Sequence, residues 1–139
     1  CGTAAETNLS GDDLVVAMPL QYYDEARERI IREVYPKYGV TLGGENARVV
    51  LLGRRHLVTF GFYYDPSELP LPRLKELFGE MLRIVAEYGG VGPGCHATGM
   101  LLVDHFEIEH DPVRAEVMRK IKRVFDPYNI MNPGKKILI

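Results

Sequence analysis

Residues 56–64, HLVTFGFYY, decide the fold of this chain. Every second residue from Val58 onward is apolar and aromatic or β-branched, which is typical of a strand with one buried face. The residues of that face are Val58, Phe60, Phe62 and Tyr64. Residues 48–52 form a second strand-like run, and Gly53-Arg54-Arg55 between the two runs is typical of a turn. The stretch 48–64 therefore predicts a β-hairpin.

Two further elements are expected before the hairpin. The apolar run 14–18 predicts a buried strand within residues 13–20. Asp24 has a side chain that caps helices, so we expect a helix to begin there. Pro36 ends or kinks that helix, and Gly39 lies just beyond it.

Two helices are expected after the hairpin. Pro72 suits the first position of a long helix that Gly89 and Gly90 stop. Asp111 and Pro112 open a last helix in the same way. In this last helix we expect Val113, Val117, Ile121, Val124 and Phe125 to face inward, and Arg114, Arg119, Lys120, Lys122 and Arg123 to face outward or sideways. Residues 100–108 are ambiguous between strand and helix.

The element order predicts an α+β fold with a mainly antiparallel sheet and helices on one face. A ferredoxin-like cap domain is the simplest topology. No fourth strand is obvious in the sequence, so we expect a neighbouring piece of chain to be missing from the sheet. We divide the chain into an α+β substrate or cap domain, residues 1–110, and a C-terminal helix with its tail, residues 111–139.

The composition is that of an ordinary globular domain. The 139 residues are 46% hydrophobic and 26% charged, and the formal net charge of -2 argues against nucleic-acid binding. We expect no membrane span, because no apolar run approaches the roughly 20 residues that one requires. Nothing at the N-terminus is typical of a signal peptide. Two cysteines are too few for a disulfide framework, which favours a reduced, cytoplasmic setting.

The loop 90–99, GVGPGCHATG, is the strongest internal candidate for chemistry. Its glycines allow the backbone to approach a ligand closely. The imidazole of His96 can take a proton, hold a metal ion or hydrogen-bond a carboxylate. The alternative interpretation is a turn-rich loop with a partly exposed histidine.

Two other groups could contact a substrate. Arg54 and Arg55 form a basic pair, and a guanidinium can bind both oxygens of a carboxylate. The alternative for this pair is a solvated hairpin turn. Tyr63 or Tyr64 could bind a substrate, although aromatic residues on strands more often pack against their neighbours.

The most specific string is 126–135, DPYNIMNPGK, which follows a basic amphipathic helix. Each part of it alone is typical of a turn. The whole string resembles the C-terminus of FAD-linked oxidases of the glycolate oxidase and D-lactate dehydrogenase type, in the vanillyl-alcohol-oxidase superfamily. That family also carries a Gly-Glu-His-Gly loop after a long helix, and Gly94, His96 and Gly99 match it here.

The resemblance implies roles for particular residues. His96 is expected to be catalytic, as the base or hydroxyl partner of the substrate. Arg54, Arg55 and Tyr64 are the substrate-binding candidates, and Asn132, Gly134 and Lys135 are expected at the edge of the cofactor. We expect no metal, because Cys95 replaces the acid of the family's loop. Leu102 stands where the family often has a lysine. Only His56 stands near the place of the family's other histidine-rich segment.

The resemblance further implies a C-terminal, substrate-binding portion of an FAD-dependent oxidoreductase, which oxidises a 2-hydroxy acid such as D-lactate or glycolate by hydride transfer to the flavin. No glycine-rich pyrophosphate motif follows a strand in the sequence, so we expect FAD to be held mainly by a partner domain or subunit absent from this chain. The alternatives are part of a phenol or aryl-alcohol oxidase of the same superfamily, and a non-enzymatic ferredoxin-like binding module.

Overall fold

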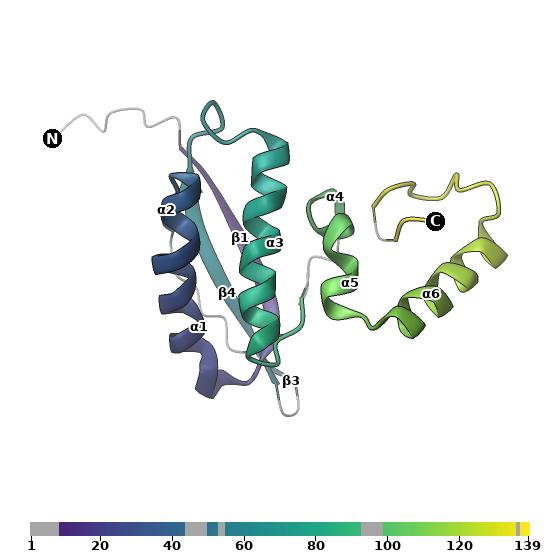
Figure 1. The fold of residues 1–139 in the computed structure, drawn as a ribbon, viewed down its shortest axis with the longest axis horizontal. Coiled ribbons are helices and arrows are strands. Elements are labelled where there is room, and N and C mark those ends of the chain that lie inside the picture. Colours follow the sequence, from purple (N-terminus) through teal and green to yellow (C-terminus); the bar gives the residue numbers. More distant parts are fainter. Residues whose placement is uncertain (1–8, 44–49, 53–54, 93–98, 136) are drawn as a thin grey trace, which may run out of the picture.

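The computed structural model describes residues 9–43, 50–52, 55–92, 99–135 and 137–139. It confirms the α+β class: an antiparallel sheet carries helices on one face (Figure 1). The C-terminal helix and tail lie beyond this two-layered part, past two short helices (Figure 1). None of the described helices is both long and apolar enough to cross a membrane.

The sheet is organised around β4, Arg55–Tyr64. Strand β1, Ser10–Met18, pairs with all but the first residue of β4, from Ser10 opposite Tyr64 to Met18 opposite His56. On its other edge β4 pairs with β3, Val50–Leu52, at one end and with β2, Thr41–Leu42, at the other. The predicted hairpin is confirmed as β3 and β4. The two-residue strand β2 was not predicted, because it is too short to show a period.

The segment after the long helix touches the outer edge of the sheet. Ala17 and Val91 form an isolated antiparallel bridge, with N–H to carbonyl distances of 2.7 and 2.9 Å in the two directions. The strand order is β1–β4–β2, so β1 is the last full strand on that side. This bridge ties the beginning of the glycine-rich loop to the sheet.

The first helical region is a composite rather than one α-helix. Helix α1, Tyr23–Arg29, continues into a π-helical segment, Ile30–Val34, and then into α2, Tyr35–Tyr38. The proline ring prevents normal α-helical pairing one turn earlier, and the wide π turn accommodates it. Pro36 does not end the helical region, which continues to Tyr38 and ends at Gly39, whose φ is 65°.

Asp24 does not cap this helix. The helix begins at Tyr23, and the cap position, Tyr22, makes no side-chain hydrogen bond. Asp24 instead lies in the first turn, where a negative charge is favourable beside the positive end of the helix. The predicted cap residue was therefore wrong by two positions.

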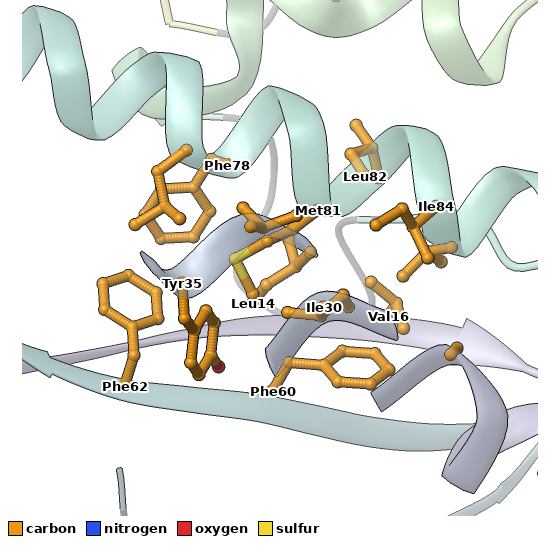
Figure 2. Packing of buried hydrophobic residues seen from close by; sticks show 14 of the residues in the cluster. Leu14, Val16, Ile30, Tyr35, Phe60, Phe62, Phe78, Met81, Leu82 and Ile84 are labelled. Carbon is orange, nitrogen blue, oxygen red and sulfur yellow. The ribbon is translucent and has the colours of Figure 1, made fainter. Parts of the chain in front are cut away.

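The main core lies between the sheet and the helices. Figure 2 shows Phe62 of β4 pointing toward Phe78 of α3, Leu71–Glu87, and the ring of Phe60 packs on Tyr23 at 5.3 Å between centroids. The Phe62 and Phe78 rings meet edge to face at 5.6 Å between centroids, a favourable aromatic arrangement. The burial predicted for Val58, Phe60 and Phe62 is confirmed, but Thr59 and Gly61 between them are buried as well, so residues 58–62 do not alternate in burial.

The ambiguous stretch 100–108 is helical. It forms α4, Gly99–Leu102, a 3₁₀ turn, Val103–His105, and α5, Phe106–Glu109. The 3₁₀ turn is attached to α3 by two contacts: His105 Nε2 bonds the Lys75 carbonyl at 2.8 Å, and Lys75 Nζ pairs with Asp104 at 2.7 Å. The sequence shows no helical period of 3.6 residues here, because the 3₁₀ turn separates two helices of only four residues each.

Gly79 allows this attachment. A Cβ at Gly79 would lie 2.6 Å from His105 Nε2, closer than real Cβ atoms approach other atoms. Gly79→Ala is expected to lower the free energy of unfolding by about 1 kcal/mol, because an overpacking cost of 1–3 kcal/mol exceeds a helix-propensity gain of about 1 kcal/mol. In a His105→Ala background the same change should be stabilising. Urea unfolding of the four variants measures this, and the same sign in both backgrounds would contradict it.

The last helix, α6, Pro112–Phe125, begins as predicted. The Asp111 carboxylate accepts hydrogen bonds from the backbone N–H groups of Val113 and Arg114, both at 3.0 Å. Behind α6 lies a second, small hydrophobic cluster made by Phe106, Ala115 and Ile137. The tail therefore returns to pack on α5 and α6.

The prediction for the apolar face of α6 was wrong, whereas three of the basic residues expected to face outward, Arg114, Lys120 and Arg123, are exposed as predicted. The residues expected to face inward form an exposed stripe, which we call the α6 ridge: Val113, Val117, Ile121, Val124 and Phe125. Val124 is 76% exposed and Phe125 is 78% exposed. Two of the basic residues, Arg119 and Lys122, reach the tail instead, where they bond the carbonyls of Leu138 and Met131. The helix thus turns Ala115, Met118 and these two basic side chains to its own chain, and most of its apolar residues outward.

Candidate functional site

One end of the sheet gathers residues that are far apart in the sequence. Arg55 and His56 begin β4, and His56 lies opposite Met18 of β1. Across β1, Val91 is bridged to Ala17, the neighbour of Met18. Adjacent strands are about 4.8 Å apart, and Ala17 lies opposite Leu57, so the backbone of Val91 lies about 10 Å from Leu57, the third residue of β4. The loop 90–99 therefore starts near the same end of the sheet as Arg55 and His56, with β1 between them.

The two residues at this end differ in exposure. Arg55 is exposed, whereas His56 is partly buried on the core side of β4. The Nδ1 atom of His56 is buried and has no hydrogen-bond partner within the part of the chain that the structure describes. A buried polar atom without a partner is costly, so this end of the sheet has an unmet capacity for a polar contact. His96 and Arg54 lie outside the described residues.

Tyr64 lies at the opposite end of the same strand. Nine residues separate it from Arg55, which corresponds to about 30 Å along a strand. Its ring packs on Phe62 at 5.9 Å, and it borders the main core. Tyr63, on the other face, is the more exposed of the two tyrosines. A small hydroxy acid cannot contact Arg55 and Tyr64 together.

The three tail residues lie in a third place. Asn132 and Gly134 both have left-handed backbone conformations, with φ of 49° and 69°. The Lys135 N–H bonds the Asn132 carbonyl at 3.4 Å, which closes a turn, and Lys135 is exposed. In Figure 1 the tail lies away from the sheet, beyond α4 and α5. The structure of this chain therefore does not join the tail residues to Arg55.

Asn132 borders an apolar groove between α6 and the tail. The groove has a volume of about 420 Å³ and is lined by Met118, Ile121, Lys122, Met131, Asn132 and Ile137. Ile121 also belongs to the α6 ridge, so the groove opens onto that exposed apolar surface. The combination of apolar walls and a few polar groups is typical of a ligand or partner contact.

Asp126 was missed by the sequence reasoning, which took Asp-Pro only as a helix stop. It is 3% exposed, and its two carboxylate oxygens accept the N–H groups of Ile130 and Met131, both at 2.9 Å. Lys122 pairs with the same carboxylate. The Lys122 ammonium and these backbone donors lower the pKa of Asp126. A lysine four residues before a helix-ending aspartate was the available signal.

Comparison with known proteins decides the family. A family model described as "FAD linked oxidases, C-terminal domain" matches residues 50–136, well over half of the chain. The chain belongs to this family. The match begins at β3 and runs through the tail, so it contains the Arg55–His56 end of the sheet, the loop 90–99 and Asp126.

Curated relatives of this FAD-linked oxidase domain are similar over short stretches. A D-lactate dehydrogenase of Archaeoglobus fulgidus is 42% identical over 57 residues, which are 41% of this chain and 13% of the relative. A D-2-hydroxyglutarate dehydrogenase of Stutzerimonas stutzeri is 43% identical over 51 residues, 37% of this chain and 11% of the relative. The glycolate oxidase subunit GlcD of Bacillus subtilis is 32% identical over 65 residues, 47% of this chain and 14% of the relative. The chain thus spans little more than a tenth of these relatives.

The family uses FAD, and the described tail suits contact with one edge of a flavin. The Asn132 amide and the exposed Lys135 side chain provide hydrogen-bond donors, while Met131 and Ile121 provide an apolar wall. An apolar wall fits the ring system of a flavin better than its pyrophosphate. Among the residues that the structure describes, no cluster of three or more His, Cys, Asp or Glu side chains could hold a metal ion.

Proposed function

We propose that this chain is the C-terminal, substrate-binding portion of an FAD-dependent enzyme that oxidises a 2-hydroxy acid. The observation that supports this most is the Ala17–Val91 bridge, which starts the His96 loop at the same end of the sheet as Arg55 and His56, one strand away from them. The three relatives described above, named for D-lactate, D-2-hydroxyglutarate and glycolate, share this substrate class. When bound, FAD supplies the acceptor for the hydride.

The two ends of a 2-hydroxy acid require different partners. Its carboxylate suits the exposed guanidinium of Arg55, which can donate to both oxygens and holds a fixed charge. Its hydroxyl must lose a proton during oxidation, and the imidazole of His96 is the proposed acceptor of that proton. Arg54 would add a second positive charge beside Arg55.

Tyr64 has no contact with the same substrate molecule in this proposal. The strand length separates it from Arg55 by about 30 Å, and its ring is engaged with Phe62. Its role is the packing role that aromatic residues on strands commonly have.

The α6 ridge is the proposed contact with the FAD-binding part of the enzyme. Five apolar side chains along one side of a 14-residue helix are exposed. A contiguous apolar stripe of this kind marks an interaction surface in soluble proteins. The tail and its groove lie next to the ridge, so the same docking would bring Asn132, Gly134 and Lys135 toward the flavin.

We also propose that the sheet is part of a ferredoxin-like unit. The order β1–β4–β2, with both long helical segments on one face, supports this topology. Val91 lies where a further strand would pair with the outer edge of β1. A strand from the rest of the enzyme would extend the sheet along that edge.

The test is to assemble the chain with its FAD-binding part and measure oxidation of D-lactate, glycolate, D-2-hydroxyglutarate and 4-hydroxybenzyl alcohol. Turnover of at least one hydroxy acid, with none of the alcohol that lacks a carboxylate, is expected because Arg55 selects the carboxylate. Activity on the aryl alcohol alone would identify an aryl-alcohol oxidase instead. An assembly that binds no flavin would favour a non-enzymatic module.

A further inference from the structure

The turn after α6 is held by one carboxylate. Asp126 is the residue at which α6 ends, and its own N–H still bonds the Lys122 carbonyl at 2.8 Å. Its carbonyl accepts the Asn129 N–H at 3.1 Å, and its side chain accepts the next two N–H groups, those of Ile130 and Met131. One residue thus binds three successive backbone donors of the turn.

Lys122 completes the arrangement. Its ammonium group pairs with the Asp126 carboxylate and also donates to the Met131 carbonyl at 2.7 Å. Met131 is therefore held at both its N–H and its carbonyl, by two side chains of opposite charge. Because the carboxylate is buried, the paired ammonium is needed to offset its loss of hydration. We call Lys122 and Asp126 the tail clasp.

The clasp holds backbone conformations that are unfavourable by themselves. Asn129 and Asn132 have φ values of 51° and 49°, in the left-handed region that most residues avoid. Such conformations persist where surrounding contacts fix them. Asn132 directly follows Met131, so the clasp sets the direction in which the Asn132–Lys135 turn leaves the helix.

Burial of apolar side chains does not explain this turn. Tyr128 is 85% exposed and Ile130 is 77% exposed, although both lie inside the segment that the clasp encloses. A buried ion pair in a turn without an apolar core is weak evidence of a role in stability. Fixing the position of the residues that follow is the function that the contacts fit.

We propose that Asp126, supported by Lys122, is a positioning residue that fixes Asn132, Gly134 and Lys135 at the edge of the flavin. The inference rests on the proposed function, since it places the tail beside the cofactor. Neither Asp126 nor Lys122 contacts the reacting atoms in this proposal. Both act through the backbone of Met131 and the turn after it.

The first experiment uses the chain itself and needs no flavin. Asp126→Asn replaces one acceptor oxygen by an NH₂ group and removes the charge that pairs with Lys122. Amide hydrogen exchange at Ile130 and Met131 is expected to become at least about tenfold faster, because each N–H loses part or all of its acceptor. Asp111→Asn, a matched change at the other end of α6, should leave both amides unchanged. Equal exchange rates of the Ile130 and Met131 amides in the Asp126 variant and the wild type would show that the Asp126 carboxylate does not hold this turn.

The second experiment uses the enzyme assembled with its FAD-binding part. Asp126→Asn and Lys122→Met are each expected to change the visible absorbance spectrum of the flavin and to lower kcat by about 10²-fold, as small misplacements do, while KM changes by less than about twofold. The double variant should be no worse than either single one, because both break one unit. Asp111→Asn should behave as wild type.

The outcomes separate the two proposals. A wild-type assembly without flavin would overturn the proposed function and the positioning role together, whatever hydrogen exchange shows. A flavin-loaded wild type whose Asp126 and Lys122 variants keep its spectrum and kcat would overturn the positioning role alone. Additive losses in the double variant would also contradict it, because they would mean that the two residues act separately.

Discussion

His96→Ala in the enzyme assembled with its FAD-binding part is expected to lower turnover of the 2-hydroxy acid by 10²–10⁴-fold, the range typical for loss of a general base. The reason is that oxidation of an alcohol requires its hydroxyl proton to leave. The loop that carries His96 begins at the Ala17–Val91 bridge, at the end of the sheet where the proposed carboxylate partner Arg55 also lies. Without the imidazole, water must take the proton.

The measurement should separate kcat from KM. A lost proton acceptor lowers kcat and kcat/KM alike, whereas a lost binding contact mainly raises KM. The rise of kcat/KM with pH on the acid side should also disappear in the variant, since it reports the free base. Cys95→Ala, at the neighbouring position, is the control for a general change in the loop. Turnover of the His96 variant within about twofold of wild type would remove His96 from the mechanism.

Val117→Glu is expected to weaken association of the chain with its FAD-binding part by at least about 10²-fold. Val117 lies in the middle of the α6 ridge and is exposed in the isolated chain. Its replacement should therefore leave the folding of the chain unchanged. In the assembled enzyme the new carboxylate would be buried without a partner, at a cost of about 3 kcal/mol. Each 1.4 kcal/mol is a factor of ten in affinity.

Arg123→Ala is the matched control for this experiment. It changes the net charge of α6 by the same one unit, but its exposed side chain lies off the ridge and pairs only loosely with Glu116 at 3.6 Å. Surface pairs of this kind contribute little. Titration of the separately produced FAD-binding part with each variant gives the affinities. If Val117→Glu and Arg123→Ala bind equally well, the ridge is not the docking surface.

The core and the ends of most elements could be predicted from local patterns. Alternation at Val58, Phe60 and Phe62 placed these side chains in the core, because strand geometry fixes which residues share a face. Asp111 and Gly39 marked a helix start and a helix end, because capping and left-handed backbone depend on residues a few positions apart. Asp24 shows the limit of this reasoning. A residue type that often caps helices does not by itself determine at which residue the helix begins.

The candidate site could be predicted only in part. The resemblance marked the tail and the loop, but three-dimensional pairing was needed to bring Val91 to the end of the sheet where β4 starts. The structure also shows that Arg55 and Tyr64 lie at opposite ends of one continuous strand. The sequence alone did not give the length of that strand. Asp126 was overlooked because its partners Ile130 and Met131 are backbone donors, which carry no signature in the sequence.

The sequence by itself determined the α+β class, the buried face of β4 and the family to which the tail points, because these depend on periodicity and on short motifs. Only the tertiary structure decided how α6 is oriented. An amphipathic pattern shows that a helix has an apolar side, but not whether that side meets its own chain or a partner. Here Ala115 and Met118 pack on the small cluster and Lys122 and Arg119 are held by the tail, so this side of α6 faces its own chain and the ridge stays exposed.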